Sequence, residues 1–354
     1  MTRKRILVSG IVVAVLAGLV YFQYREWRHF DWSVFWKLTA DTRPFYLLSA
    51  VAMIYATYLL RAVRWKVFLR PVCRARARDL IAPTLIGFTG LALLGRPGEF
   101  ARPYLIARRE GLTMSSQVAV WAVERIFDIG SFTVLLTIDL FTMDFTRYPV
   151  LLYYRREFLV AGVILIGIVA ALAAGAYVIR RNAAGVAHWV HQRFAGWAPG
   201  FAHHAEQKVY AFGEGLHTIH DLGSFAQLTG LSLLIWLLIA VTYRQVTHAY
   251  PLPLREMTVS NVVLIIGFSM VGSLVQLPAI GGGMQAATIG GINHYFTIPN
   301  EMAVSCGIML WLACFMVVIP AGLILAHREH VSFGKMSRES DKPPEPEIQA
   351  SPGN

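Results

Sequence analysis

The residues of this chain that could do chemistry are charged side chains set against apolar segments. Arg96, Glu99 and Arg102 follow directly on an apolar run, residues 80–94, that ends at Gly95. Charged groups at membrane depth are costly, and they usually line a cavity or a transport pathway. On a helix, Glu99 lies three residues from each arginine and can approach either guanidinium group. We therefore expect these charges to pair inside the protein.

A second charged group, Glu124, Arg125 and Asp128, lies in the next apolar segment. Glu124 and Asp128 are four residues apart, so they share one face of a helix. These charges could pair inside the protein and still leave one or two guanidinium groups free, and arginine binds phosphate through a bidentate fork. We therefore expect the six residues to bind an anionic phospholipid or a polyprenyl phosphate. The alternative interpretation is that they are interfacial charges that reach into lipid head groups.

The apolar run before the first group is too short to cross a bilayer, which takes about 20 helical residues. A short apolar segment that ends in Gly-Pro-Gly and charge indicates a re-entrant hairpin near residues 80–95. The pattern recurs near residues 259–277, where a Pro/Gly break follows. Two interrupted segments in corresponding halves predict an internal two-fold repeat with a binding site between the halves.

Candidate binding residues also lie in the second break, where glycines leave backbone N–H groups open to a ligand. These residues are Gly281, Gly282, Gly283 and Gln285. The alternative interpretation is that the glycines form a turn or allow close helix packing.

The motif Gly95-Arg96-Pro97-Gly98-Glu99-Phe100-Ala101-Arg102, followed by Glu124-Arg125-Ile126-Phe127-Asp128, resembles the signature of the lysylphosphatidylglycerol synthase transmembrane region. That region is the flippase-like domain of the multiple peptide resistance factor and its stand-alone relatives. The resemblance extends over about residues 5–328. In the family, the second break is usually Pro-Gly-Gly-x-Gly followed by Glu. Here Ala279 and Ile280 replace two glycines, and Gln285, a neutral amide, stands where the glutamate would be.

The composition is that of a polytopic membrane protein. The 354 residues are 56% hydrophobic and only 15% charged, and the mean hydropathy is +0.51. A formal net charge of +11 in such a chain indicates basic cytoplasmic loops that face anionic lipid, and not binding to nucleic acid. The cysteines, Cys73, Cys306 and Cys314, lack metal-ligand spacing, so we expect free thiols.

Hydropathy predicts an all-α protein with about six full crossings and two broken or re-entrant helical hairpins. The predicted crossings are residues 6–24, 45–61, 118–140, 157–179, 225–249 and 302–326. We interpret the first as an uncleaved anchor, with a cleaved signal peptide as the alternative.

Basic residues fix the predicted orientation. The end of the second crossing is interpreted as a cytoplasmic loop because of its positive charges. These charges are Arg61, Arg64, Lys66, Arg70, Arg74, Arg76 and Arg78. An even number of crossings then places both termini in the cytoplasm, and we expect a multi-pass protein of the bacterial inner membrane.

Residues 182–222 are the least apolar part of the core, and we expect them to form cytoplasmic surface helices. They hold histidine pairs such as His188 and His191, but no carboxylate or thiol completes a metal site at a clear spacing. We therefore predict no metal and no cofactor. Residues 329–354 are expected to be a disordered cytoplasmic tail, which leaves residues 1–328 as one flippase-like transmembrane domain.

No catalytic triad, nucleotide-binding loop or haem motif is recognised, so no catalytic residue is assigned. The leading hypothesis is a lipid translocase that works by alternating access around the two broken hairpins. One alternative is an intramembrane lipid-modifying transferase that uses Glu99, Glu124 or Asp128 in acid–base chemistry. The arginine beside each carboxylate disfavours it, because such pairs suit structural ion pairing. The other alternative is a scaffold for a membrane glycosyltransferase partner.

Overall fold

The computed structural model describes residues 30–196, 200, 202–203, 205–207, 209, 222–273 and 282–329, and these form helices joined by short turns, with no strand among them. The all-α class of integral membrane protein is thereby confirmed, because five helical segments within the described residues are long and apolar enough to cross a membrane. They are α3 (Pro44–Leu69), α4 (Ala77–Leu94), α8 (Arg155–Arg181), α11 (Leu222–His248) and the final segment Asn300–Arg328. The predicted crossing 6–24 and the tail from residue 330 lie outside the described residues.

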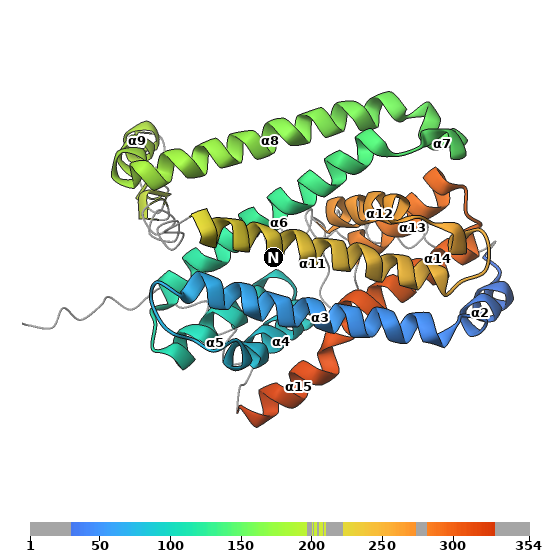
Figure 1. Cartoon of the computed structure of the whole chain (residues 1–354), viewed down its shortest axis with the longest axis horizontal. Coiled ribbons are helices and arrows are strands. Elements are labelled where there is room, and N and C mark those ends of the chain that lie inside the picture. Colours follow the sequence, from blue (N-terminus) through green and yellow to red (C-terminus); the bar gives the residue numbers. More distant parts are fainter. Residues whose placement is uncertain are drawn as a thin grey trace, which may run out of the picture.

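The centre of the molecule is an antiparallel pair, α3 and α11, which pack along their whole lengths (Figure 1). The backbone N–H of Arg43 donates to the carbonyl of Ala249 at 3.0 Å, so the start of α3 meets the end of α11. At the other end of the pair, Leu69 and Leu228 share an apolar cluster with Leu80. A third long helix, α6 (Met114–Thr142), packs against α11 and carries α8 on its outer side.

The first predicted hairpin is present. It consists of α4, the 3-10 helix η1 (Arg96–Phe100) and α5 (Ala101–Glu110). The chain turns back at Gly95, which has a φ of 71°, and Arg109 reaches Asp79 at 3.6 Å. Although α4 is long enough to cross a bilayer, these contacts return the chain to the side where α4 began. The hairpin closes tightly, because a Cβ at Gly98 would collide with the carbonyl of Gly90.

A second helical hairpin lies at the opposite end of the bundle. It pairs α12 (Val259–Gly272) with α13 (Gly283–Phe296), and residues 274–281 between them lie outside the described residues. Ser269 and Thr288 hydrogen bond across it at 2.6 Å, and a Cβ at Gly272 would collide with the carbonyl of Gly283. Because α12 follows the end of α11, this hairpin enters from the opposite side to α4 and α5. Such an inverted arrangement is what the predicted repeat requires; the repeat and the number of crossings stay predictions.

The remaining elements connect and cover the bundle. They are α2 (Trp32–Ala40), η2 (Phe145–Arg147), α7 (Pro149–Tyr153), α9 (Ala183–Ala195) and η3 (Leu254–Glu256). The final segment consists of α14 (Asn300–Trp311), a π-helical turn η4 (Leu312–Met316) and α15 (Val318–Arg328), and α15 packs against α4. The three cysteines are free, as predicted, and burial raises the pKa of the Cys73 thiol above its usual value.

The glycine contact in the first hairpin makes a testable prediction. Replacing Gly98 with Ala should destabilise the protein by ~1–3 kcal/mol, the usual effect of overpacking, because the added methyl group meets the backbone of α4. Gly130→Ala in α6 is the matched control, since a Cβ there meets nothing within 4 Å. Thermal unfolding of both variants in detergent micelles measures the difference. Equal melting temperatures would show that the hairpin is not closed this tightly.

Candidate functional site

Two arginines that the sequence analysis assigned to a cytoplasmic loop lie inside a helix. α3 continues to Leu69, beyond the predicted end at residue 61, because the apolar residues Val67 and Phe68 follow the charges and pack in the core. Arg61 is 7% exposed and Arg64 is fully buried. The loop interpretation is therefore wrong for these two residues, and the buried site is larger than predicted.

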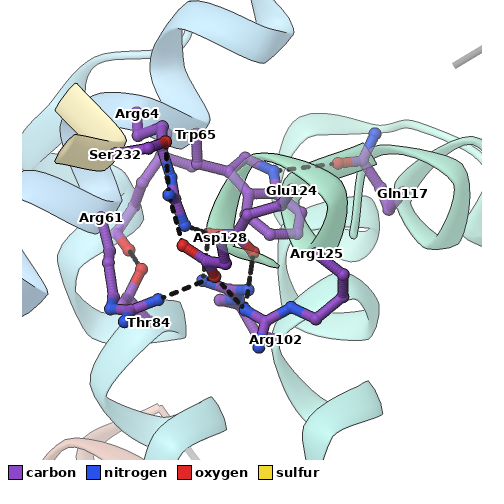
Figure 2. Close-up of polar contacts among 11 residues, drawn as sticks. Arg61, Arg64, Trp65, Thr84, Arg102, Gln117, Glu124, Arg125, Asp128 and Ser232 are labelled. Carbon is purple, nitrogen blue, oxygen red and sulfur yellow. Dashed lines mark hydrogen bonds and ion pairs between the residues drawn. The ribbon is translucent and has the colours of Figure 1, made fainter. Parts of the chain in front are cut away.

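Arg64 joins both predicted carboxylates (Figure 2). Its Nη2 lies 2.6 Å from Glu124 Oε1, and its Nη1 lies 2.6 Å from Asp128 Oδ1. The same Nη1 donates to the hydroxyl of Ser232, on α11, at 2.8 Å. Arg61 adds a longer contact of 3.3 Å to Asp128. Charges in a low-dielectric interior persist only when they are paired and hydrogen bonded, and this network meets that condition for the carboxylates.

Arg102 reaches the network from the tip of the first hairpin. Its two terminal nitrogens contact the two oxygens of Glu124, which is the bidentate geometry of a strong charge-assisted pair. The guanidinium group also stacks over the ring of Trp65, 4.2 Å from the ring centre, and Trp65 is held by a 3.3 Å hydrogen bond to Gln117. The hairpin thus positions Arg102 against Glu124 on α6.

Arg125 is the most solvent-accessible of the charged residues in this network. Its side chain is 32% exposed, against 0–9% for Arg61, Arg64, Arg102, Glu124 and Asp128. Its Nη2 lies 3.0 Å from Asp128 and 3.5 Å from Glu124. We call the six residues the arginine–carboxylate cluster. They are Arg61, Arg64, Arg102, Glu124, Arg125 and Asp128.

The cluster carries more positive than negative charge. Four guanidinium groups face two carboxylates among the described side chains, which leaves a formal excess of two positive charges. A small cavity opens beside them, lined by Arg102, Arg125 and Glu99 together with apolar side chains, and Glu99 supplies one further negative charge. Its volume of about 20 Å³ has room for a water molecule and not for a head group. The arrangement can therefore attract an anion, and the cleft must widen before a lipid phosphate enters.

The predicted site residues separate into those that meet and those that do not. Arg102, Glu124, Arg125 and Asp128 come together as predicted. Glu99 lines the cavity but forms no ion pair with any side chain that the structure describes, so the expected pairing of Glu99 with Arg102 is wrong: Arg102 turns to Glu124 instead. The side chain of Arg96 lies outside the described atoms.

The predicted residues of the second break lie elsewhere. Gly282 caps α13, Gly283 and Gln285 lie in its first turn, and the carbonyl of Gly283 packs against Gly272 of α12. No described contact joins these residues to the arginine–carboxylate cluster. Gly281 lies outside the described residues. A shared site between the two hairpins therefore stays a prediction.

A sequence signal for Arg61 and Arg64 did exist. The two residues are one helical turn apart, and residues 65–69, which follow them, are apolar except for Lys66, whereas a loop would turn polar at once. Charges with apolar helix on both sides are typical of an intramembrane site. Positive charges at the end of an apolar run are instead typical of a cytoplasmic loop that sets the orientation of the protein.

The histidine-rich surface also differs from the sequence interpretation. Glu206 completes a group with His191 and His203 whose ligand atoms lie within 4.8 Å of one another. His191 Nδ1 and Glu206 Oε2 are 2.8 Å apart, and both side chains are only partly exposed, so a direct contact between these two residues accounts for their approach.

The helical bundle, the two hairpins and the buried charges define a polytopic membrane protein with an ionic site among its helices. The chain belongs to the lysylphosphatidylglycerol synthase TM region family, whose sequence model matches residues 6–322, and the resemblance is thereby confirmed. It is also similar to the glycosyltransferase AglD of Haloferax volcanii, with 32% identity over 131 residues. That match covers 36% of this chain and 20% of the curated relative, so most of the relative has no counterpart in the match. No solved structure matches the chain significantly.

The pairing of Glu124 makes a prediction about stability. Glu124→Gln removes the charge that pairs with Arg64 and Arg102 in a buried site, and breaking such a pair costs ~3–5 kcal/mol. The control is Glu329→Gln, whose ion pair with Arg109 is partly exposed and should contribute ~0–1 kcal/mol. Melting temperatures of the purified proteins in detergent compare the two. A similar small change in both variants would contradict the buried network.

Proposed function

We propose that this protein moves an anionic, phosphate-bearing lipid between the leaflets of the bacterial inner membrane. The observation that carries the proposal is that the cluster holds two more positive than negative charges, of which Glu99 offsets one at the adjacent cavity that Arg102 and Arg125 line. A phosphate group would supply the missing negative charge and accept the bidentate hydrogen bonds that guanidinium groups offer. The lipid is a phospholipid or a polyprenyl phosphate.

Alternating access around the two hairpins is the proposed mechanism. The tip of the first hairpin carries Arg102, so a movement of α4 and α5 relative to α6 would open the cleft and separate Arg102 from Glu124 at the same time. The deeply buried pairs of Arg64 would stay in place. In this proposal both termini lie in the cytoplasm, where the basic loop that follows α3 faces anionic lipid.

A second candidate function is a role in glycosyl transfer to a lipid, either as part of a transferase or as its membrane partner. The similarity to the glycosyltransferase AglD favours it, although the match covers a fifth of that protein. Analysis of lipids after incubation with the purified protein separates the candidates. A new lipid species supports transfer, and unchanged lipids that exchange leaflets support translocation.

Leaflet exchange of a fluorescent anionic lipid in proteoliposomes tests the translocase directly. Arg125→Gln should slow exchange about tenfold or more, because losing a charge-assisted hydrogen bond to the phosphate costs ~1.5–3 kcal/mol. Arg108→Gln, an exposed arginine on α5, is the control for lost surface charge and should exchange lipid normally. Exchange by Arg125→Gln at the rate of the intact protein, in vesicles that hold equal amounts of folded protein, would contradict the proposed site.

A further inference from the structure

Asp139 is a buried carboxyl group that the proposed mechanism does not use. It lies near the C-terminal end of α6, is 8% exposed and forms no ion pair with any side chain that the structure describes. Its Oδ2 atom is buried and has no hydrogen-bond partner among the described residues. Glu124 and Asp128 on the same helix differ from it, because each of them contacts three arginines.

The second hairpin covers Asp139. α12 packs against α6, and Ser260, in the first turn of α12, interacts with the Asp139 carboxyl group. The Ser260 hydroxyl is buried and, like Asp139 Oδ2, completes no hydrogen bond within the described part of the chain. A shift of α12 relative to α6 would therefore uncover this carboxyl group.

The surroundings of Asp139 supply no compensating cation. α6 packs against α5, α8, α11 and α12; α5 meets it beside the arginine–carboxylate cluster, and α12 contains no titratable side chain. The titratable side chains at the start of α8 are exposed, namely Arg155, Arg156 and Glu157. Those at the end of α11 and in the turn after α6 are Tyr243, Arg244, His248, Asp144, Arg147 and Tyr148. None of them forms an ion pair or a hydrogen bond with Asp139 where the structure describes the chain.

Burial without a partner has a chemical consequence for a carboxyl group. An ionised carboxylate in an interior without water is costly unless a cation pairs with it, so such a group binds a proton instead. Carboxyl groups within membrane helices carry protons in pumps and transporters. A neutral carboxyl group needs no partner while α12 covers it, and water admitted by a movement of α12 would let it release the proton.

The position of Asp139 gives the side from which the proton comes. Eleven residues separate it from Asp128, which is about 17 Å along the axis of α6. Its neighbour Ser260 follows the end of α11, and that end lies beside Arg43 at the start of α3. The basic loop at the other end of α3 faces the cytoplasm in the proposed orientation. Asp139 therefore lies in the outer half of the protein, on the side from which protons flow into a bacterial cell.

We propose that Asp139 is a proton-binding site that couples lipid movement to the proton gradient across the membrane. It holds a proton while the second hairpin covers it, and it releases the proton when α12 moves away from α6. The inference rests on the proposed function and adds its source of energy. Because Glu124 and Asp139 belong to one helix, a shift of α6 relative to both hairpins changes the contact between Arg102 and Glu124 and the burial of Asp139 together.

The distribution of a fluorescent anionic lipid between leaflets measures the coupling. Proteoliposomes of zwitterionic lipid hold a trace of fluorescent phosphatidylglycerol, and valinomycin with potassium clamps the membrane potential. With one proton per lipid, a gradient of about one pH unit supports up to about a tenfold difference between the leaflets. Asp139→Asn should still exchange the lipid but leave it evenly distributed, because an amide cannot bind and release the proton.

Asp144→Asn is the matched control. Asp144 is an exposed carboxylate just beyond the same end of α6 that caps η2, and asparagine keeps a capping oxygen. This variant should enrich the lipid in one leaflet as the intact protein does. Equal enrichment by Asp139→Asn would overturn the inference, as would an even distribution produced by intact protein that exchanges lipid.

Infrared spectroscopy of the purified full chain tests the proton site separately from lipid movement. Exposed carboxylates are ionised near pH 7, so a protonated carboxyl band that is lost in Asp139→Asn belongs to Asp139. Asp139→Glu keeps a carboxyl group and should shift the band, so it serves if Asp139→Asn does not fold. A missing band in the intact protein, or a band that neither variant changes, would overturn the inference. If the band is present but the intact protein exchanges no lipid, the proposed function fails and the proton site remains.

Discussion

Arg64 is the residue on which the interior of this protein depends, because it forms ion pairs with Glu124 and Asp128 at once. Both carboxylates lie in the middle of α6, where water is excluded and an unpaired charge would cost several kcal/mol. The contact with Ser232 adds α11 to the same network. The relative positions of α3, α6 and α11 are therefore fixed by ionic geometry as well as by apolar packing.

The first hairpin depends on a different constraint, the absence of side chains. Gly90 and Gly98 bring the backbone of α4 against η1, and a Cβ at Gly87 would collide with Arg102 itself. Only a hairpin closed this tightly places Arg102 both over Trp65 and within reach of Glu124. Glycine packing in α4 is thus the local cause of a charge contact on a distant helix.

The sequence predicted the parts of this arrangement that are local. Gly95 and the charges after it indicated the hairpin, and the four-residue spacing of Glu124 and Asp128 placed both on one face of α6. It missed Arg61 and Arg64, because their partners lie about 60 residues away in the sequence. Hydropathy alone assigns positive charges near the end of an apolar helix to a cytoplasmic loop. The expected pairing of Glu99 with Arg102 failed for a related reason: local spacing permits the contact, and tertiary packing offers Arg102 a fully buried partner, Glu124, instead.

The arginines of the cluster differ in how easily each can change partners. Arg64 is fully buried and bound on three sides, so exchanging its carboxylates for a ligand would break its ion pairs with both Glu124 and Asp128 inside the core. Arg125 is one-third exposed and shares Asp128 with Arg61 and Arg64, so Asp128 keeps two cations if Arg125 turns toward the cavity. A phosphate at the cavity can therefore recruit Arg125 at little cost to the core. This asymmetry allows one network to hold the helices together and still bind an anion reversibly.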